Sequence, residues 1–108
     1  MIPRDLNAWA EFLNEYLSDN LSGIAVDDIL IGYEQEDELL NLIQRYCLAL
    51  IVDLRTDIDQ RTRKQRLQQL KESIENGRTN VLSFLKLQAE TPLFPWMRDD
   101  VKRLTDEG

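Results

Sequence analysis

The feature that most constrains the fold of this chain is a run of sixteen mostly apolar residues, LLNLIQRYCLALIVDL, at positions 39–54. A membrane-spanning helix needs about 20 such residues, and this shorter run carries Gln44 and Arg45 near its middle and Asp53 near its end. The run is also long for a strand, it begins without alternation, and it contains no Gly or Pro. The sequence therefore predicts a core helix at 39–54.

A rotation of about 100° per residue gives this helix two unlike halves. One apolar stripe is formed by Leu39, Ile43, Tyr46, Leu50 and Leu54. The opposite side of the first half is polar, with Asn41, Gln44 and Arg45. In the second half Leu48, Ile51 and Val52 point toward that opposite side, so we expect burial nearly all round toward the helix end. Another helix of the same chain is the expected cover, and a partner protein is the alternative.

The segments before this run predict one helix and a connection. Residues 4–21 repeat apolar side chains at helical spacing, and Gly23 supplies a stop. Residues 24–33 are rich in β-branched side chains, which favour extended structure. A lone strand has no partner to pair with, so we expect an apolar loop or one helical turn there. The acidic residues 34–38 favour a helix start near 33–36, because carboxylates oppose the positive end of the helix dipole.

The stretch from 33 to 76 contains no Gly or Pro, which would allow one long helix. Leu67, Leu70 and Ile74 nevertheless lie roughly opposite the apolar stripe of the 39–54 helix. We therefore predict a turn or kink near 57–62, with Asp57 or Asp59 capping a third helix. One continuous helix within an extended or dimeric assembly is the alternative.

The last third of the chain predicts two more helices. Asn76 and Gly77 should end the third helix, and Thr79 or Asn80 should cap a fourth. The fourth helix should bury Val81, Leu82, Phe84, Leu85 and Gln88, and it should stop at Thr91–Pro92. A short final helix started by Pro95 should carry Met97, Val101 and Leu104 on one face. The expected fold is a single all-α domain, 1–108, in which a compact bundle of four helices is followed by a short C-terminal helix.

The residues that most catalytic sites need are scarce in this chain. It has no histidine and a single cysteine, Cys47, and it contains no phosphate-binding or nucleophile motif. We therefore expect a protein that is not an enzyme and binds no cofactor or metal ion. Cys47 lies within the apolar run and should act as a small core hydrophobe. One cysteine cannot form an internal disulfide, and no signal peptide or membrane segment is evident, so we expect a cytoplasmic protein.

Charge is distributed unevenly along the chain, whose net charge is −7. A basic patch is formed by Arg61, Arg63, Lys64 and Arg66. It suits contact with a nucleic acid or an acidic surface. The alternative is that it pairs with the acidic N-terminal half of its own fold or of a neighbouring molecule. We favour pairing, because an acidic protein repels phosphate backbones and no aromatic residue is interleaved to stack on bases. A nucleic acid is accordingly not the expected partner.

A second charged cluster, the candidate acidic face, is formed by Glu34, Glu36, Asp37 and Glu38. It has two interpretations. It can be a solvated surface that gives solubility. It can also be a recognition face for a basic partner, as in inhibitors and immunity-type proteins that block a basic site on a toxin or a nucleic-acid-binding protein.

The segment PLFPWM near the C-terminus places aromatic and thioether side chains between two prolines. Trp and Met are enriched at protein interfaces. The candidate partner-binding residues are Leu48, Ile51, Val52, Phe94, Trp96 and Met97. The same tail could instead fold back and cap the bundle. The sequence thus predicts a self-associating, protein-binding module that serves as an adaptor or as an assembly or regulatory subunit.

Overall fold

The computed structural model describes residues 3–18, 35, 37–51 and 58–106. These residues form an all-α bundle with a short C-terminal helix, as predicted. The elements are α1 (Leu6–Leu17), α3 (Glu38–Ile51), α4 (Gln60–Glu75), α5 (Arg78–Ala89), the 3₁₀ turn η1 (Pro95–Met97) and α6 (Arg98–Asp106). Within these ranges, no helix is long and apolar enough to cross a membrane.

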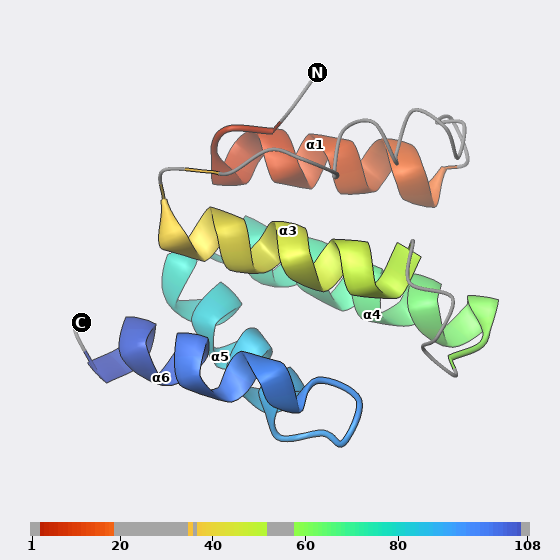
Figure 1. The fold of residues 1–108 in the computed structure, drawn as a ribbon. Coiled ribbons are helices and arrows are strands. Elements are labelled where there is room, and N and C mark those ends of the chain that lie inside the picture. Colours follow the sequence, from red (N-terminus) through yellow and green to blue (C-terminus); the bar gives the residue numbers. More distant parts are fainter. Residues whose placement is uncertain (1–2, 19–34, 36, 52–57, 107–108) are drawn as a thin grey trace.

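α4 is the helix at the centre of the packing. α4 packs against α1, α3 and α5, and α5 packs in turn against η1 and α6 (Figure 1). α3 runs alongside α6 in the opposite direction and contacts it. The largest fully buried side chains come from α1, α3, α4 and α5 and from the segment before η1: Trp9, Tyr46, Phe94, Leu13, Leu39, Leu42, Ile43, Leu50, Leu67, Leu70 and Leu85.

Aspartates cap the starts of α1 and α3. The Asp5 carboxylate accepts the backbone N–H of Ala8 at 2.7 Å, and α1 follows directly. The Asp37 carboxylate accepts the N–H of Leu39 at 2.9 Å, so α3 begins at Glu38, slightly after the predicted start at 33–36. Both caps satisfy N–H groups that have no partner inside the helix. The predictions for residues 24–33 lie outside the described residues.

The burial of α3 differs from the predicted pattern. Its first half is buried on most sides, Gln44 included, whereas Leu48 and Ile51 are only half-buried. Gln44 can be buried because its side-chain oxygen accepts a hydrogen bond from Nε2 of Gln35 at 3.3 Å. The same nitrogen of Gln35 donates to the carbonyl of Pro3 at 2.7 Å. The predicted burial of the second half on nearly all sides is therefore wrong at Leu48 and Ile51, and Val52 lies outside the described residues. The predicted polar side of the first half is wrong at Gln44, because helical periodicity does not reveal a hydrogen-bond partner that lies before the helix.

The predicted break between the second and third helices is confirmed. Asp59 has an extended backbone, and its carboxylate accepts the N–H of Thr62 at 2.7 Å, so α4 begins at Gln60. The single long helix is excluded, since Asp59 interrupts the helical backbone. The apolar face of α4 is buried, with Leu67, Leu70 and Ile74 in the core.

Gly77 forms the junction between α4 and α5. Asn76 ends α4, as predicted, and Gly77 has φ 105°, a conformation that residues with a side chain rarely adopt. The Gly77 carbonyl accepts the N–H of Asn80 at 3.1 Å, so α5 starts directly after the glycine. The prediction that Thr79 or Asn80 caps this helix is wrong, because both residues lie inside its first turn.

The end of the chain follows the predicted pattern. Pro95 begins η1, which leads directly into α6. Met97 and Val101 are buried, and Leu104 is half-buried on the same side. The C-terminal segment is thus packed on the bundle.

Candidate partner-binding surface

The large apolar side chains exposed within the described residues all lie in one short stretch. Leu87 is 64% exposed, Leu93 39% and Trp96 37%, and they fall within ten consecutive residues. This stretch runs from the end of α5 through the loop into η1, at the edge of the bundle (Figure 1). We call residues 87–97 the apolar corner. Large apolar side chains that stay exposed along one short segment are candidates for contact with a partner.

Two buried side chains hold the apolar corner in place. Phe94 and Met97 are fully buried. The Phe94 ring lies 5.2 Å from the ring of Tyr46, a residue of α3, and 6.4 Å from the ring of Trp96. Burial of an aromatic ring contributes several kcal/mol in an ordinary core, on the order of 3 or more. The exposed residues therefore sit on a segment that is fixed to the core.

Hydrogen bonds from two arginines and a threonine hold the same segment in place. Arg66 of α4 donates from Nη1 to the side-chain oxygen of Gln88 at 2.6 Å. Arg98 donates from Nε to the carbonyl of Ala89 at 3.2 Å, and Thr91 donates its hydroxyl to the carbonyl of Gln88 at 2.8 Å. These bonds fix the end of α5, from which the loop leaves. A surface that is ordered before binding loses less conformational entropy when a partner arrives.

Trp96 also connects the apolar corner to the face between α3 and α6. The guanidinium of Arg45 lies over its ring, 4.7 Å from the centroid. Nη1 of Arg45 donates to Oδ2 of Asp100 in α6 at 2.7 Å. Trp and Arg are the residues most often found to dominate binding energy at protein interfaces. Their contact here makes the α3–α6 face part of the candidate surface.

The structure divides the predicted partner-binding residues into three groups. Trp96 is exposed, as a binding residue must be. Phe94 and Met97 are fully buried, so they support the surface from inside and are not themselves available to a partner. Leu48 and Ile51 are half-buried on α3. Val52 lies outside the described residues.

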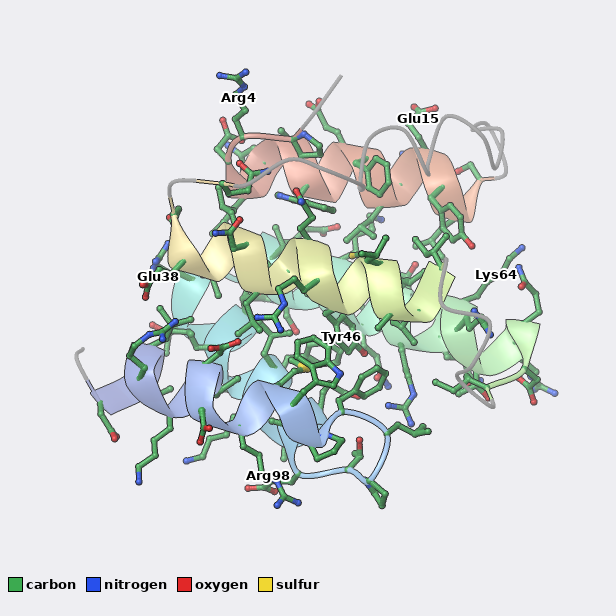
Figure 2. All side chains as sticks on the ribbon, viewed as in Figure 1. Arg4, Glu15, Glu38, Tyr46, Lys64 and Arg98 are labelled. Carbon is green, nitrogen blue, oxygen red and sulfur yellow. The ribbon has the colours of Figure 1, made fainter. Side chains whose placement is uncertain are left out.

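The predicted basic patch is also divided. Arg63 donates to the carbonyls of Leu50 and Ile58, the second at 2.9 Å, and thereby ties α4 to the end of α3. Arg66 binds Gln88 and lies over the Phe94 ring. Arg61 is exposed and Lys64 is half-buried; Lys64 projects from the first turns of α4 at the edge of the molecule (Figure 2). Arg63 and Arg66 therefore have a role inside the fold.

Two members of the predicted acidic face are engaged by arginines of the same chain. The guanidinium of Arg78 donates to both oxygens of Asp37, at 2.9 and 3.1 Å. Glu38 lies 3.4 Å from Nε of Arg103. Glu34 and Glu36 lie outside the described residues. The two acids that the structure places are thus partly neutralised, which does not favour a strongly acidic recognition face at this position.

The net charge of the protein is carried by positions outside the described residues. The described part holds 12 basic and 12 acidic side chains, and the remaining positions hold one basic and eight acidic ones. These remaining positions account for the whole net charge of −7. The described surface is therefore neutral as a whole, with positive and negative groups close together.

The pair formed by Asp37 and Arg78 makes stability depend on pH. The hydrogen bonds from Arg78 lower the pKa of Asp37 below its ordinary value of 3.8, against a smaller opposing effect of burial. A carboxylate with a lowered pKa stabilises the fold above its unfolded pKa and loses that contribution as pH falls. We expect Asp37→Asn to be destabilised by at most about 1 kcal/mol at neutral pH, because the pair is well exposed.

Urea unfolding of both proteins between about pH 6 and about pH 2, the range that brackets carboxyl titration, measures this effect. The stability difference between Asp37→Asn and the unaltered protein should shrink as pH falls below about 4. Glu75→Gln, which removes a carboxylate from a pair within α4, is the control for general acid effects. A difference that stays constant over the whole range would contradict the assignment.

Cys47 has the environment of a core residue. It is fully buried in α3, and burial raises the pKa of its thiol. Among the described residues, no group of three or more His, Cys, Asp or Glu side chains could hold a metal ion. Comparisons of the chain with protein-family models, with curated proteins and with solved structures found no match.

Sequence reasoning missed Leu87, Leu93 and the arginines of the α3–α6 face. One signal was present: Leu87 lies on the side of its helix opposite Val81 and Leu85, which are buried. An apolar residue on the outer side of an amphipathic helix is a candidate contact residue. The contact between Arg45 and Trp96 joins positions 51 residues apart, and no local pattern reveals it.

Proposed function

We propose that this chain is a non-enzymatic protein-binding module that associates with itself, and that the apolar corner is its contact surface. The observation that carries the proposal is the exposure of Leu87, Leu93 and Trp96 within one segment anchored by buried Phe94 and Met97. Water contact with these side chains is unfavourable by roughly 25 cal/mol per Å² of apolar surface. A partner that covers the corner recovers this free energy with little ordering of the loop.

The titratable groups of the described residues support binding over catalysis. Asp37, Glu38 and Asp100 are each paired with an arginine. Cys47 is buried, and the raised pKa of its thiol disfavours the thiolate that acts as a nucleophile. These groups maintain contacts between helices. A role as an adaptor or as an assembly or regulatory subunit fits such a molecule.

Self-association is also compatible with the charge of the described surface. Two copies approach each other with equal numbers of positive and negative groups on the described residues. Like-charge repulsion between these parts is therefore small, whereas a uniformly acidic surface would oppose contact. A cytoplasmic location suits a chain with a single cysteine and no possible internal disulfide.

Substitution of the exposed side chains tests the proposal. We expect Leu87→Ser and Trp96→Ala each to weaken self-association about tenfold or more in sedimentation velocity, because central aromatic and apolar contacts dominate interfaces. Gln69→Ala removes an exposed side chain from α4 and should leave association unchanged. Circular dichroism should show all three variants folded. Association of Leu87→Ser and Trp96→Ala at the strength of the unaltered protein would rule out the corner as the contact surface.

A further inference from the structure

Four charged side chains form a continuous line across the face between α3 and α6. Glu38 lies 3.4 Å from Arg103, Arg103 lies 3.5 Å from Asp100, and Asp100 lies 2.7 Å from Arg45. The signs alternate along this line, from Glu38 at one end to Arg45 at the other. We call these four residues the charge ladder. Trp96 continues the line beyond Arg45, at 4.7 Å from its guanidinium.

The ladder is extended and open to solvent. Glu38 and Arg45 are seven residues apart on α3, which corresponds to about 10 Å along the helix axis. Glu38 lies at the start of α3, above the last turns of α6 (Figure 2). The side chains of Glu38, Arg45 and Arg103 are 51%, 54% and 50% exposed. The same residues line a surface hollow together with Leu42 and Leu104. Asp100 is less accessible, at 23% exposed, and Leu42 is buried beneath the hollow. A partner can therefore reach the three exposed charges and the half-buried Leu104 beside them.

We propose that this ladder is the recognition surface for a second copy of the chain, related to the first by a two-fold axis. The inference rests on the self-association proposed above and specifies its geometry. The axis lies in the interface and crosses the ladder at right angles between Arg103 and Asp100. Rotation about it reverses the order of the charges. Glu38 of each copy then faces Arg45 of the other, and Arg103 faces Asp100.

The alternation of sign explains why the second copy fits. A line of four alternating charges that is reversed and laid on itself places every acid opposite a base. A two-fold axis parallel to the ladder would instead place each charge against its own copy, and like charges in close contact are strongly disfavoured. The pattern therefore selects the two-fold axis perpendicular to the ladder over the one parallel to it. In the selected dimer each contact occurs twice, once from each copy.

Other classes of partner fit the ladder less well. A nucleic acid would meet Glu38 and Asp100 beside the two arginines, and these carboxylates repel phosphates. A uniformly basic protein would be repelled by Arg45 and Arg103 in the same way. Trp96 supplies apolar contact at one end of the line, while the charges fix the orientation of the partner.

A charge exchange between two variants tests this geometry. Glu38→Arg places an arginine opposite Arg45 of its copy, and Arg45→Glu places a glutamate opposite Glu38. Each variant alone should associate about tenfold more weakly than the unaltered protein, because close charge pairs at interfaces have large coupling energies. An equimolar mixture should recover most of the affinity, since in the mixed dimer every acid again faces a base. Sedimentation velocity of the separate and mixed variants measures both effects.

Two further pairs make the test decisive. Arg103→Glu and Asp100→Arg should behave in the same way, and they replace the first pair if circular dichroism shows that either of its members is unfolded. Lys71→Glu and Glu75→Lys exchange a pair within α4, away from the ladder, and should associate like the unaltered protein both alone and mixed. Added salt should weaken association of the unaltered protein.

The outcomes separate this inference from the proposed function. Weak association of each variant and recovery in the mixture would support the two-fold ladder. Association that is unchanged in the variants, or that fails to recover in the mixture, would overturn the ladder while self-association through the apolar corner stands. An unaltered protein that stays monomeric would instead overturn the proposed function, and the ladder with it.

Discussion

Replacement of Phe94 by alanine is expected to lower the free energy of unfolding by about 3–5 kcal/mol. Phe94 is fully buried, and its ring packs against the ring of Tyr46 at 5.2 Å. Removal of the ring takes away buried apolar surface and leaves a cavity that the fixed helices around it cannot close. Urea denaturation followed by circular dichroism measures the loss.

The matched control for this substitution lies two residues along the chain. Trp96 is 37% exposed, so Trp96→Ala should cost about 1 kcal/mol or less, mainly through the lost contact with Arg45. Phe94→Ala should therefore unfold at a much lower urea concentration than Trp96→Ala. Equal midpoints for the two variants would show that Phe94 is not the core anchor of the apolar corner.

Replacement of Gly77 by alanine should cost about 1–3 kcal/mol, for a reason that involves the backbone alone. Gly77 has φ 105° and ψ 170°, a region that is essentially restricted to glycine. A Cβ added at this position would meet no atom within 4 Å, so steric contact with neighbours contributes nothing. The expected loss therefore measures the backbone strain at the junction of α4 and α5, by thermal or urea unfolding.

Thr79→Ala is the control for Gly77→Ala. If Thr79 capped α5, as its sequence position suggests, this substitution would cost about 1 kcal/mol. Thr79 lies instead in the first turn and is exposed, so we expect its replacement to change stability by less than about 0.5 kcal/mol. A loss at Thr79 comparable to that at Gly77 would contradict the observed helix start.

The helices could be predicted from the sequence wherever local chemistry determines them. Asp59 lies between two helices whose apolar faces are out of phase, and its carboxylate caps α4 as expected. Asn76 and Gly77 end the same helix. Pro95 starts the last helical segment, and Met97 and Val101 follow on its buried side. In each case the signal and its effect lie within a few residues of each other.

The predictions that failed depend on contacts between distant parts of the chain. Gln44 is polar, and its burial requires the amide of Gln35 as a partner. Phe94 is an aromatic residue of the kind that interfaces favour, yet it is fully buried in the core. Sequence composition does not decide between an aromatic anchor inside the fold and one offered to a partner, because both uses bury the same ring.

The candidate surface also combines a residue that the sequence indicates with contacts that only the fold creates. Trp96 was predicted as a contact residue and is exposed. The charge ladder joins Glu38 and Arg45 of α3 to Asp100 and Arg103 of α6, and only the antiparallel packing of these helices aligns the four charges. Individual exposed ion pairs contribute little to stability, typically about 0–1 kcal/mol. The alternating signs of the four charges along one face therefore bear more on the recognition of a partner than on the stability of the fold.

Sedimentation equilibrium of the unaltered protein over a wide concentration range tests the central claim, self-association, most directly. The chain has a mass of 12.7 kDa. The account predicts that the weight-average mass rises with concentration from this value toward about twice it, as expected for a closed two-fold dimer, and that added salt shifts the rise to higher concentration. A mass that stays at 12.7 kDa up to millimolar concentration would contradict the account.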